Sequence, residues 1–150
     1  MKLALILWLV HVLPQPAADP MCLATTVYLE ARGQSELGQR AIAEVALRRR
    51  DSGAWGHSVC SVVMAPGQFA MATLSPNARI VEPVAAYTAL RIAITSVDNW
   101  AEPAGRRHEI VPGANSFGLQ SSVASTSAHA HIVAVIGDHA FYRSGTVAQR

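Results

Sequence analysis

Hydrophobic residues recur at every third or fourth position in three stretches of the chain, which is the spacing of amphipathic helices. The first stretch predicts a helix over residues 20–31, with Asp19 as its N-cap and Pro20 in the first turn, where a missing N–H costs nothing. Gly33 is expected to end this helix in a left-handed conformation. The predicted buried stripe comprises Met21, Leu23, Ala24, Val27 and Ala31.

Two further helices are predicted with clear boundary signals. One covers residues 36–50, with Ser35 as its N-cap and Gly53 as its stop, and its predicted apolar face comprises Leu37, Ala41, Ile42, Val45 and Ala46. The other begins at Pro83 and continues to about residue 97. Its predicted buried stripe comprises Ala86, Leu90, Ala93, Ile94 and Val97.

Beyond residue 100 the pattern changes. Residues 104–130 are rich in Gly, Ser, Ala and Pro, and residues 110–120 within them read as a strand and a turn. Residues 131–142 alternate in polarity around Gly137-Asp138, which predicts a β-hairpin with a tight turn. Residues 58–63 are too few to assign by periodicity. Helices followed by a small antiparallel sheet predict an α+β fold.

The N-terminal segment has the pattern of an export signal. Residues 1–18 contain a lysine, an unbroken apolar run and small residues after a helix breaker, which is the order found in signal peptides. The apolar run is shorter than the roughly 20 residues that a membrane-spanning helix needs. An uncleaved signal anchor stays as an alternative because Pro16 is unfavourable near a cleavage site. Residues 19–150 then form a single catalytic domain, which we expect to be exported and monomeric.

Charge and cysteine content narrow the function further. The chain has 12 basic and 10 acidic residues, so it lacks the basic face of a nucleic-acid-binding protein. The arginines at 48–50 are explained by the favourable interaction of cations with a helix C-terminus. Cys22 and Cys60 are the two cysteines, and in an oxidising compartment they are expected to form a disulfide. Two unpaired buried thiols are the alternative.

Three groups of residues are candidates for chemistry. Glu30 lies at the end of the first helix and could be joined from elsewhere by Tyr28, Gln68, Asn115 and Ser116; a carboxyl group held there is placed to exchange protons with a substrate. A second candidate is a zinc site formed by the side chains of His129, His131 and His139. The third is a serine nucleophile in the Ser/Ala-rich stretch at 117–129, which lacks a nucleophile-elbow pattern and reads better as a loop.

Three segments resemble the cell wall hydrolase family of the spore cortex-lytic enzymes (SleB/CwlJ type). They are LATTVYLEARGQSELGQRAIAEVALRRR at 23–50, VCSVVMAPGQFA at 59–70 and VIGDHAFY at 135–142. The family has a Tyr-x-Glu-Ala-Arg-Gly-Glu signature, a Pro-Gly-Gln-Phe turn and a closing Ile-Gly-Asn-His-x-Phe-Tyr hairpin. Order and spacing match from Leu23 to Tyr142.

This resemblance implies a lysozyme-like domain that cleaves the glycan strands of peptidoglycan without a metal or other cofactor. The catalytic glutamate of the family falls on Glu30, and Gln68 and Phe69 of the Gln-Phe turn would line the same cleft. The segment GANSF at 113–117 makes Asn115 and Phe117 candidate sugar contacts. Tyr28, in the signature, is a further candidate contact.

The sequence departs from the family pattern at four positions. Gln34 replaces a glutamate, Arg48 an asparagine and Ser116 a histidine, and Met71 stands where a tryptophan or similar residue is usual. These changes leave the substrate preference open. They also suggest an alternative, in which the protein binds peptidoglycan without cleaving it. A second alternative is a zinc-dependent amidase or peptidase of the cell wall.

The absence of a second acidic residue in the matched motifs favours one type of glycan cleavage. Glycosidases that use water need two carboxyl groups at a defined separation. A single carboxyl group suffices if the 6-hydroxyl of the muramic acid attacks internally, as in a lytic transglycosylase. Should a second acid be needed, Glu36 and Asp138 are the candidates. The sequence does not distinguish a bacterial wall-remodelling enzyme from a phage lysin.

Overall fold

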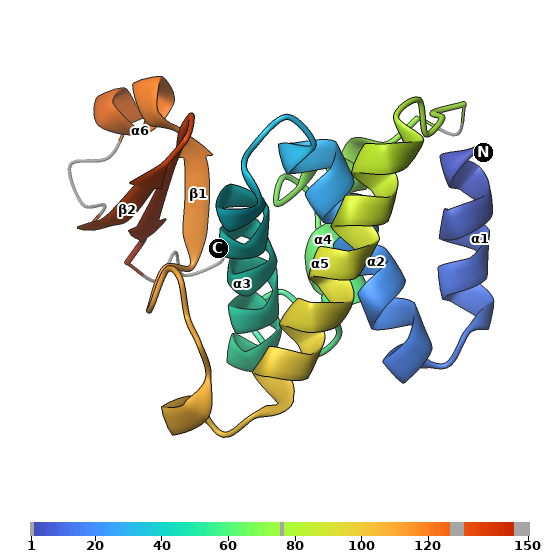
Figure 1. The fold of residues 1–150 in the computed structure, drawn as a ribbon, viewed down its shortest axis with the longest axis horizontal. Helices are drawn as coiled ribbons and strands as arrows, with labels where there is room; N and C mark the ends of the chain where they lie inside the picture. Colours follow the sequence, from blue (N-terminus) through green and yellow to red (C-terminus); the bar gives the residue numbers. More distant parts are fainter. Residues whose placement is uncertain (1, 76, 127–130, 146–150) are drawn as a thin grey trace.

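Helices form most of the protein, and one of them lies at its centre. The computed structural model describes residues 2–75, 77–126 and 131–145. Its long helices are α1 (Leu3–Val12), α2 (Gln15–Ala31), α3 (Glu36–Ser52) and α5 (Pro83–Ala101); α4 (Val59–Met64), η1 (Ala70–Thr73), η2 (Ala104–Arg106) and α6 (Gln120–Thr126) are short. Helix α2 packs against α1, α3, α4 and α5, so it is held from several sides (Figure 1).

A small antiparallel sheet lies beside α3, at the end of the molecule opposite α1 (Figure 1). It contains β1 (Ser116–Leu119), β2 (His131–Ile136) and β3 (His139–Arg143) in the order β1-β3-β2. In this register Phe117 pairs with Phe141 and Ser116 with Tyr142. The α+β architecture predicted from the sequence is therefore confirmed, including the hairpin, whose turn contains Gly137 at φ 58°.

The boundaries of α3 follow from local chemistry. The Ser35 hydroxyl accepts a hydrogen bond from the Gly38 N–H at 3.3 Å, which satisfies one of the free donors of the first turn. Gly53 ends the helix with φ 69°, a conformation that costs a residue with a Cβ more than it costs glycine. Both signals were predicted correctly. Leu37 is a correction, because it is 50% exposed rather than part of the apolar face.

The ends of α2 differ from the prediction. The helix begins at Gln15, with Pro16 in its first turn, and it continues through Pro20. Asp19 is therefore not an N-cap; its Oδ1 accepts a hydrogen bond from the Cys60 N–H at 3.3 Å and so links α2 to α4. At the other end the C-cap is Arg32, with right-handed φ and ψ, and Gly33 is not among the glycines with positive φ.

Helix α5 is rotated relative to its predicted orientation. Its buried residues are Ala89, Ile92, Ala93, Ser96 and Trp100. Leu90 and Ile94, predicted to be buried, are 41% and 46% exposed. Apolar residues occur on several faces of this helix, so periodicity alone did not select the face that packs against α2 and α3. The Ser/Ala-rich stretch also differs from the expected loop, because its first residues belong to β1 and the next form α6.

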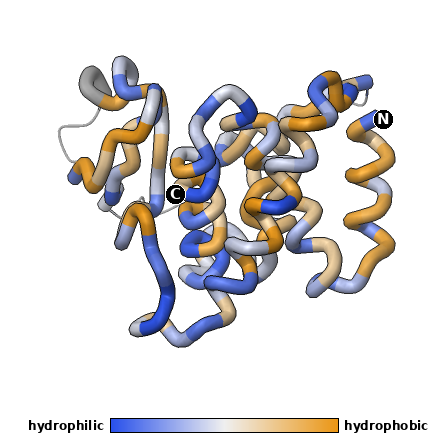
Figure 2. Tube along the Cα trace, in the orientation of Figure 1, coloured by the Kyte–Doolittle hydropathy of each residue, from blue (hydrophilic) through white to orange (hydrophobic). Residues whose placement is uncertain are grey.

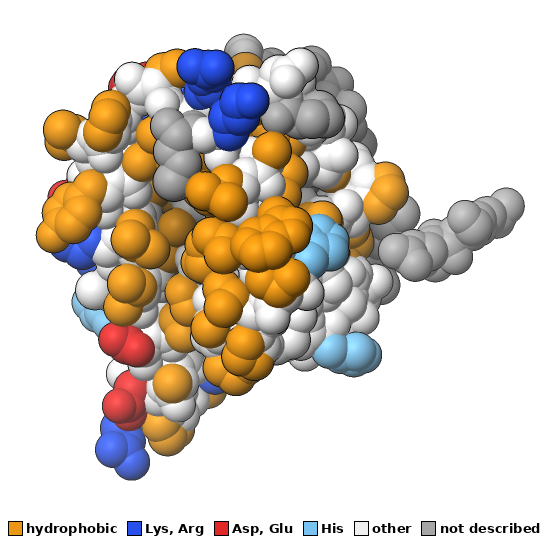
Figure 3. All heavy atoms as spheres, turned by 90° about the vertical axis from the view of Figure 1, so that its right-hand side faces the viewer, with side chains coloured by type: hydrophobic (Ala, Val, Ile, Leu, Met, Phe, Trp, Pro, Cys, Tyr) orange, Lys and Arg blue, Asp and Glu red, His pale blue; other side chains and the backbone are white. Residues whose placement is uncertain are grey.

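Helix α1 is hydrophobic along most of its length (Figure 2). Leu3, Ile6 and Val10 are buried, and the Leu3 N–H donates to the Ala78 carbonyl at 2.9 Å. The opposite face adds to a hydrophobic surface on this side of the molecule (Figure 3), where the exposed apolar residues of α1 are Leu5, Trp8 and Val12. Among the helices that the structure describes, none is both long enough and apolar enough to cross a membrane.

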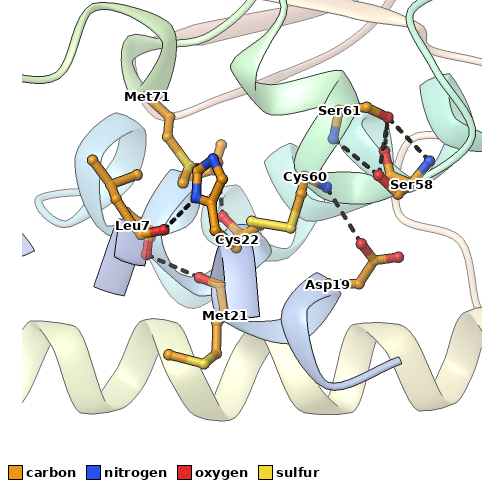
Figure 4. Close-up of a disulfide and its surroundings, with 11 residues drawn as sticks. Leu7, Asp19, Met21, Cys22, Ser58, Cys60, Ser61 and Met71 are labelled. Atoms are coloured by element: carbon orange, nitrogen blue, oxygen red, sulfur yellow. Dashed lines mark hydrogen bonds between the residues drawn. A yellow bond between two sulfur atoms is a disulfide. The ribbon is translucent and has the colours of Figure 1, made fainter. Parts of the chain in front are cut away.

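A disulfide joins α2 to α4 (Figure 4). Cys22 and Cys60 are bonded, with their Cα atoms 5.2 Å apart, and both side chains are buried. The pairing predicted from the two cysteines is therefore present. Because α4 leads directly into the turn at residues 65–69, the bridge fixes the start of this turn relative to α2.

Candidate active site

Glu30 lies one residue before the end of α2 and is half-buried. Its Oε1 accepts a hydrogen bond from the Ala70 N–H at 2.6 Å. Ala70 follows a turn in which Gly67 has φ 72°, and it begins the short helix η1. The carboxylate is thus held by a backbone donor from a segment 40 residues away in the sequence.

Aromatic rings extend from this turn to the sheet. The Phe69 and Phe117 ring centroids are 5.7 Å apart, and the His139 ring meets Phe117 edge-on at the same distance. Phe117 also lies 6.1 Å from Phe141. Phe69 and His139 are buried, whereas Phe117 is half-buried and accessible. We call the region that contains the side chains of Glu30, Phe69 and Phe117 the Glu30 face.

Arg49 lies beneath the Glu30 face and connects its parts. Its guanidinium lies 5.0 Å from the centre of the Phe69 ring and 4.9 Å from that of Trp55, within the range of cation–π attraction. Nε donates to the Asn115 carbonyl at 2.7 Å, and Nη1 donates to Gln68 Oε1 at 3.2 Å. The residue is 6% exposed.

The charge of Arg49 is part of the electrostatics of this site. Burial lowers the pKa of the Arg49 guanidinium to about 10, and the neighbouring Tyr142 and Glu30 act in the opposite direction and raise it. At neutral pH the guanidinium is therefore still charged. It supplies a buried positive charge close to the carboxylate of Glu30.

The predicted contact residues Gln68 and Asn115 lie at this site, but their side chains are already engaged. Gln68 Oε1 accepts from Arg49, and its Nε2 donates to the Pro66 carbonyl at 3.4 Å. The Asn115 amide binds the backbone of Ser144 on both sides, accepting from its N–H at 2.9 Å and donating to its carbonyl at 3.2 Å. Both side chains therefore shape the site by holding its backbone in place.

Tyr28 is not brought together with the other predicted contacts. It is 2% exposed, and its hydroxyl accepts hydrogen bonds from the N–H groups of Val81 and Glu82 at 3.1 and 3.3 Å. Residues two apart on a helix point to different sides, so Tyr28 faces the core when Glu30 faces outward. Tyr28 therefore anchors the segment before α5.

The histidines proposed as zinc ligands do not gather. His131 pairs with Arg143 at one end of the hairpin, and His139 pairs with Ile136 at the other. His129 lies outside the described residues. Within the part of the chain that the structure describes, no three His, Cys, Asp or Glu side chains are grouped as metal ligands. The hairpin register separates two residues that alternation alone had placed together.

Glu36 and Asp138, the candidates for a second catalytic acid, have other partners. Glu36 forms an ion pair with Arg91 of α5. Asp138 accepts a hydrogen bond from Gln34 Nε2 at 3.1 Å, and its N–H donates to Gln34 Oε1 at 3.3 Å. Gln34, which replaces a family glutamate, therefore ties the hairpin turn to the loop after α2.

Two cavities lie elsewhere in the molecule. One of about 300 Å³ between α3 and α5 is lined by polar residues that include Glu36, Arg40 and Arg91. The other, of about 260 Å³, is apolar and lies between α1, α2 and α5. Glu30 lines neither of them.

Sequence reasoning missed the role of Arg49 because the arginine run had a simpler explanation. One signal was available, since Arg49 continues the helical spacing of Ile42, Val45 and Ala46 and so falls on the buried face. A cation on a buried stripe needs partners in the interior. Arg48 is also engaged, donating to the Ala114 carbonyl and to Glu109, and neither contact was foreseen.

Comparisons with known proteins identify the family and the fold. Residues 33–142 match the Cell Wall Hydrolase family, a range that begins after Glu30 and includes Arg49, Phe69, Phe117 and the sheet. The catalytic domain of the Bacillus cereus SleB protein is 25% identical with a TM-score of 0.63, covering 83% of this chain and 89% of that one.

A second solved structure gives the same fold. The catalytic domain of the germination-specific lytic transglycosylase SleB from Bacillus anthracis is 23% identical with a TM-score of 0.63, covering 83% of this chain and 93% of that one. A sequence comparison with curated proteins gives no match. Because the family match spans well over half of the sequence and includes most of the residues around Glu30, the chain belongs to the cell wall hydrolase family.

Proposed function

We propose that this protein cleaves the glycan strands of peptidoglycan between MurNAc and GlcNAc, and that Glu30 is its catalytic acid and base. The observation that carries the proposal is the position of Glu30. Its carboxyl group is fixed by the N–H of Ala70, the residue after Phe69, and the Phe69 ring lies 5.7 Å from the accessible ring of Phe117. Aromatic rings are suitable surfaces for the apolar faces of sugars, and a fixed carboxyl group is suited to proton transfer.

The reaction that fits one carboxyl group is lytic transglycosylation. Glu30 first donates a proton to the glycosidic oxygen as the bond from that oxygen to C1 of MurNAc breaks. The resulting carboxylate then takes the proton of the MurNAc 6-hydroxyl, and O6 forms a bond to C1. The products are a 1,6-anhydro-MurNAc end and a free GlcNAc hydroxyl, with Glu30 protonated again. The name of the Bacillus anthracis relative, a lytic transglycosylase, supports this choice.

The buried positive charge of Arg49 supports the second half of this cycle. The guanidinium of Arg49 is close enough to Glu30 for their charges to interact. The Ala70 N–H donates to the same carboxyl group and fixes its orientation. Glu30 is therefore well placed to act as the base that completes the reaction.

Export is part of the proposal. A family that acts on the cell wall, together with a disulfide, fits a protein that works outside the cytoplasm. We propose that residues 1–18 are the export signal. Helix α1 is apolar on its buried and its exposed faces, whereas a helix that serves only a protein core has a polar outer face. The mass of the exported protein will show whether the segment is removed.

The test compares wild type with Glu30→Gln on purified peptidoglycan, using mass spectrometry of the released fragments. We expect Glu30→Gln to lose about 10²-fold or more of the cleavage rate while its circular dichroism spectrum and thermal midpoint stay those of wild type. Tyr28→Phe is the control: it weakens an anchor in the core and should leave the activity per folded molecule unchanged. A chelator should have little effect.

The masses of the fragments distinguish the reactions. Anhydro ends are lighter than hydrolytic reducing ends by two hydrogens and one oxygen. If all fragments have reducing ends, the protein is a hydrolase and not a lytic transglycosylase. Asp138 would then be tested as the second acid. If Glu30→Gln cleaves peptidoglycan as fast as the wild type, the assignment of Glu30 as the catalytic residue is wrong. No cleavage by the wild type would favour a non-catalytic binding protein.

A further inference from the structure

Arg49 joins three segments that are distant in the sequence. Each of its three guanidinium nitrogens donates to a different acceptor: the Asn115 carbonyl, Gln68 Oε1 and, at 3.5 Å, the Ser116 hydroxyl. The guanidinium carbon also lies 4.9 Å from the centre of the Trp55 ring and 5.0 Å from that of Phe69. The guanidinium is therefore engaged both by hydrogen bonds and by cation–π contacts.

These contacts lead to the two parts of the Glu30 face. Gln68 and Phe69 directly precede Ala70, whose N–H holds the Glu30 carboxylate. Asn115 and Ser116 directly precede Phe117, the accessible aromatic ring. A displacement of Arg49 would therefore move the donor that orients Glu30 and the strand that carries Phe117 relative to each other.

We propose that Arg49 is the positioning residue of this site, holding the turn that orients Glu30 and the strand that carries Phe117 in one fixed geometry. This inference rests on the proposed function, because it concerns the same reaction. We do not assign Arg49 a catalytic role, since it is 6% exposed and its three guanidinium nitrogens donate to protein groups. Its role is to set the distance between the acid and the bound sugar.

The arrangement requires arginine. A lysine ammonium keeps the charge, but it is a single point donor on a flexible stem without flat faces. It cannot bind the Asn115 carbonyl and Gln68 from separate nitrogens and also keep the contacts of a planar guanidinium with the rings of Trp55 and Phe69. Arg49→Lys therefore removes the geometry and keeps the charge, which separates the two contributions.

The experiment measures kcat and KM of Arg49→Lys on soluble glycan-strand fragments of peptidoglycan, normalised to the folded fraction from circular dichroism. We expect kcat to fall about 10²-fold, because small errors in the position of an acid cost rates of this order. KM should stay within about threefold, because the aromatic surface is retained. A role limited to stability would lower the thermal midpoint and leave kcat per folded molecule unchanged.

Arg48→Lys is the matched control. Arg48 precedes Arg49 on α3, lies 5.2 Å from the Trp100 ring and binds Glu109 and the Ala114 carbonyl, so the same exchange removes comparable contacts, none of them to the turn that orients Glu30. We expect Arg48→Lys to lose stability and to keep the wild-type kcat and KM. Trp55→Leu removes one cation–π contact of Arg49 and keeps its three hydrogen bonds; it should lower kcat by a smaller factor.

The outcomes separate this inference from the proposed function. If Glu30→Gln is inactive and both Arg49→Lys and Trp55→Leu keep the wild-type kcat, the positioning role is overturned and the catalytic assignment stands. Equal losses of kcat in Arg48→Lys and Arg49→Lys would also overturn it. If Arg49→Lys does not fold, Trp55→Leu decides: a lower kcat at unchanged KM supports the role, and a wild-type kcat refutes it.

Discussion

Removal of the disulfide provides a quantitative test of how this small domain is stabilised. The bridge closes a segment with a sequence separation of 38 residues. In the chain-entropy model a loop of this length contributes about 4 kcal/mol, mainly by restricting the unfolded chain. Since domains of this size have a total stability of about 5–15 kcal/mol, the bridge is a large part of it. We expect Cys22→Ala/Cys60→Ala to lower the thermal midpoint by about 10 °C.

The assay is urea unfolding of wild type and the double variant, each with and without reductant, followed by circular dichroism. Without reductant the free energies of unfolding should differ by about 4 kcal/mol. With reductant the difference should shrink to about 1 kcal/mol, which is the packing lost when buried sulfur atoms are replaced by hydrogen. The reduced wild type thus separates the cross-link from the side chains.

Two results would refute this reasoning. If oxidised wild type and the double variant differ by less than about 1 kcal/mol, the bridge does not stabilise the fold through the unfolded chain. If the exported protein, denatured without reductant, shows two reactive thiols, the bridge does not form where the protein works. In the second case the position of α4 would depend on the Asp19–Cys60 hydrogen bond and on the packing of buried residues such as Val59 and Val62.

The remaining predictions concern single residues. Burial raises the pKa of the Glu44 carboxyl above its ordinary 4.5, so the folded chain holds this proton more tightly than the unfolded chain. The stabilisation from this group is present below pH 4.5 and is lost as the pH rises through the higher folded pKa. The unfolding free energy of wild type minus that of Glu44→Gln should therefore decrease as the pH rises above 4.5, and a flat difference would contradict this reasoning. Ser35→Ala removes the hydroxyl that accepts from Gly38 and should cost about 1 kcal/mol in urea unfolding, with Ser35→Thr as the control. Gly53 has φ +69°, and Gly53→Ala would place a Cβ 2.8 Å from the His57 imidazole, so it should lower the unfolding free energy by about 1 kcal/mol or more. The control is Gly33→Ala, whose Cβ meets nothing within 4 Å and which should be nearly neutral. Equal costs for the two variants would refute the argument from φ.

Local features were determined by the sequence. Ser35 and Gly53 bound α3 because the capping hydroxyl and the left-handed glycine act within one helical turn. Gly137 allows the tight turn between β2 and β3 for the same reason. The alternation of residues 131–142 was sufficient for a hairpin. Cys22 and Cys60 could pair only with each other within the chain.

Long-range features were decided by the tertiary structure. Helix α5 has apolar residues on several faces, so its contacts with α2 and α3 selected Ile92 over Leu90 for burial. Hairpin register placed His131 and His139 at opposite ends of the strands, which removed the zinc site proposed from spacing. In each case the sequence offered several arrangements of similar local energy, and packing against distant segments selected one.

The candidate site shows the same division. A motif identified Glu30, because residues around it in the chain carry the family signature. It did not identify Arg49, whose partners lie 19 and 66 residues away along the chain. The motif also included Tyr28 as a contact, although the helix turns it into the core. Local sequence specifies backbone conformation over a few residues, whereas an active site forms only when folding brings side chains from distant segments within hydrogen-bonding distance.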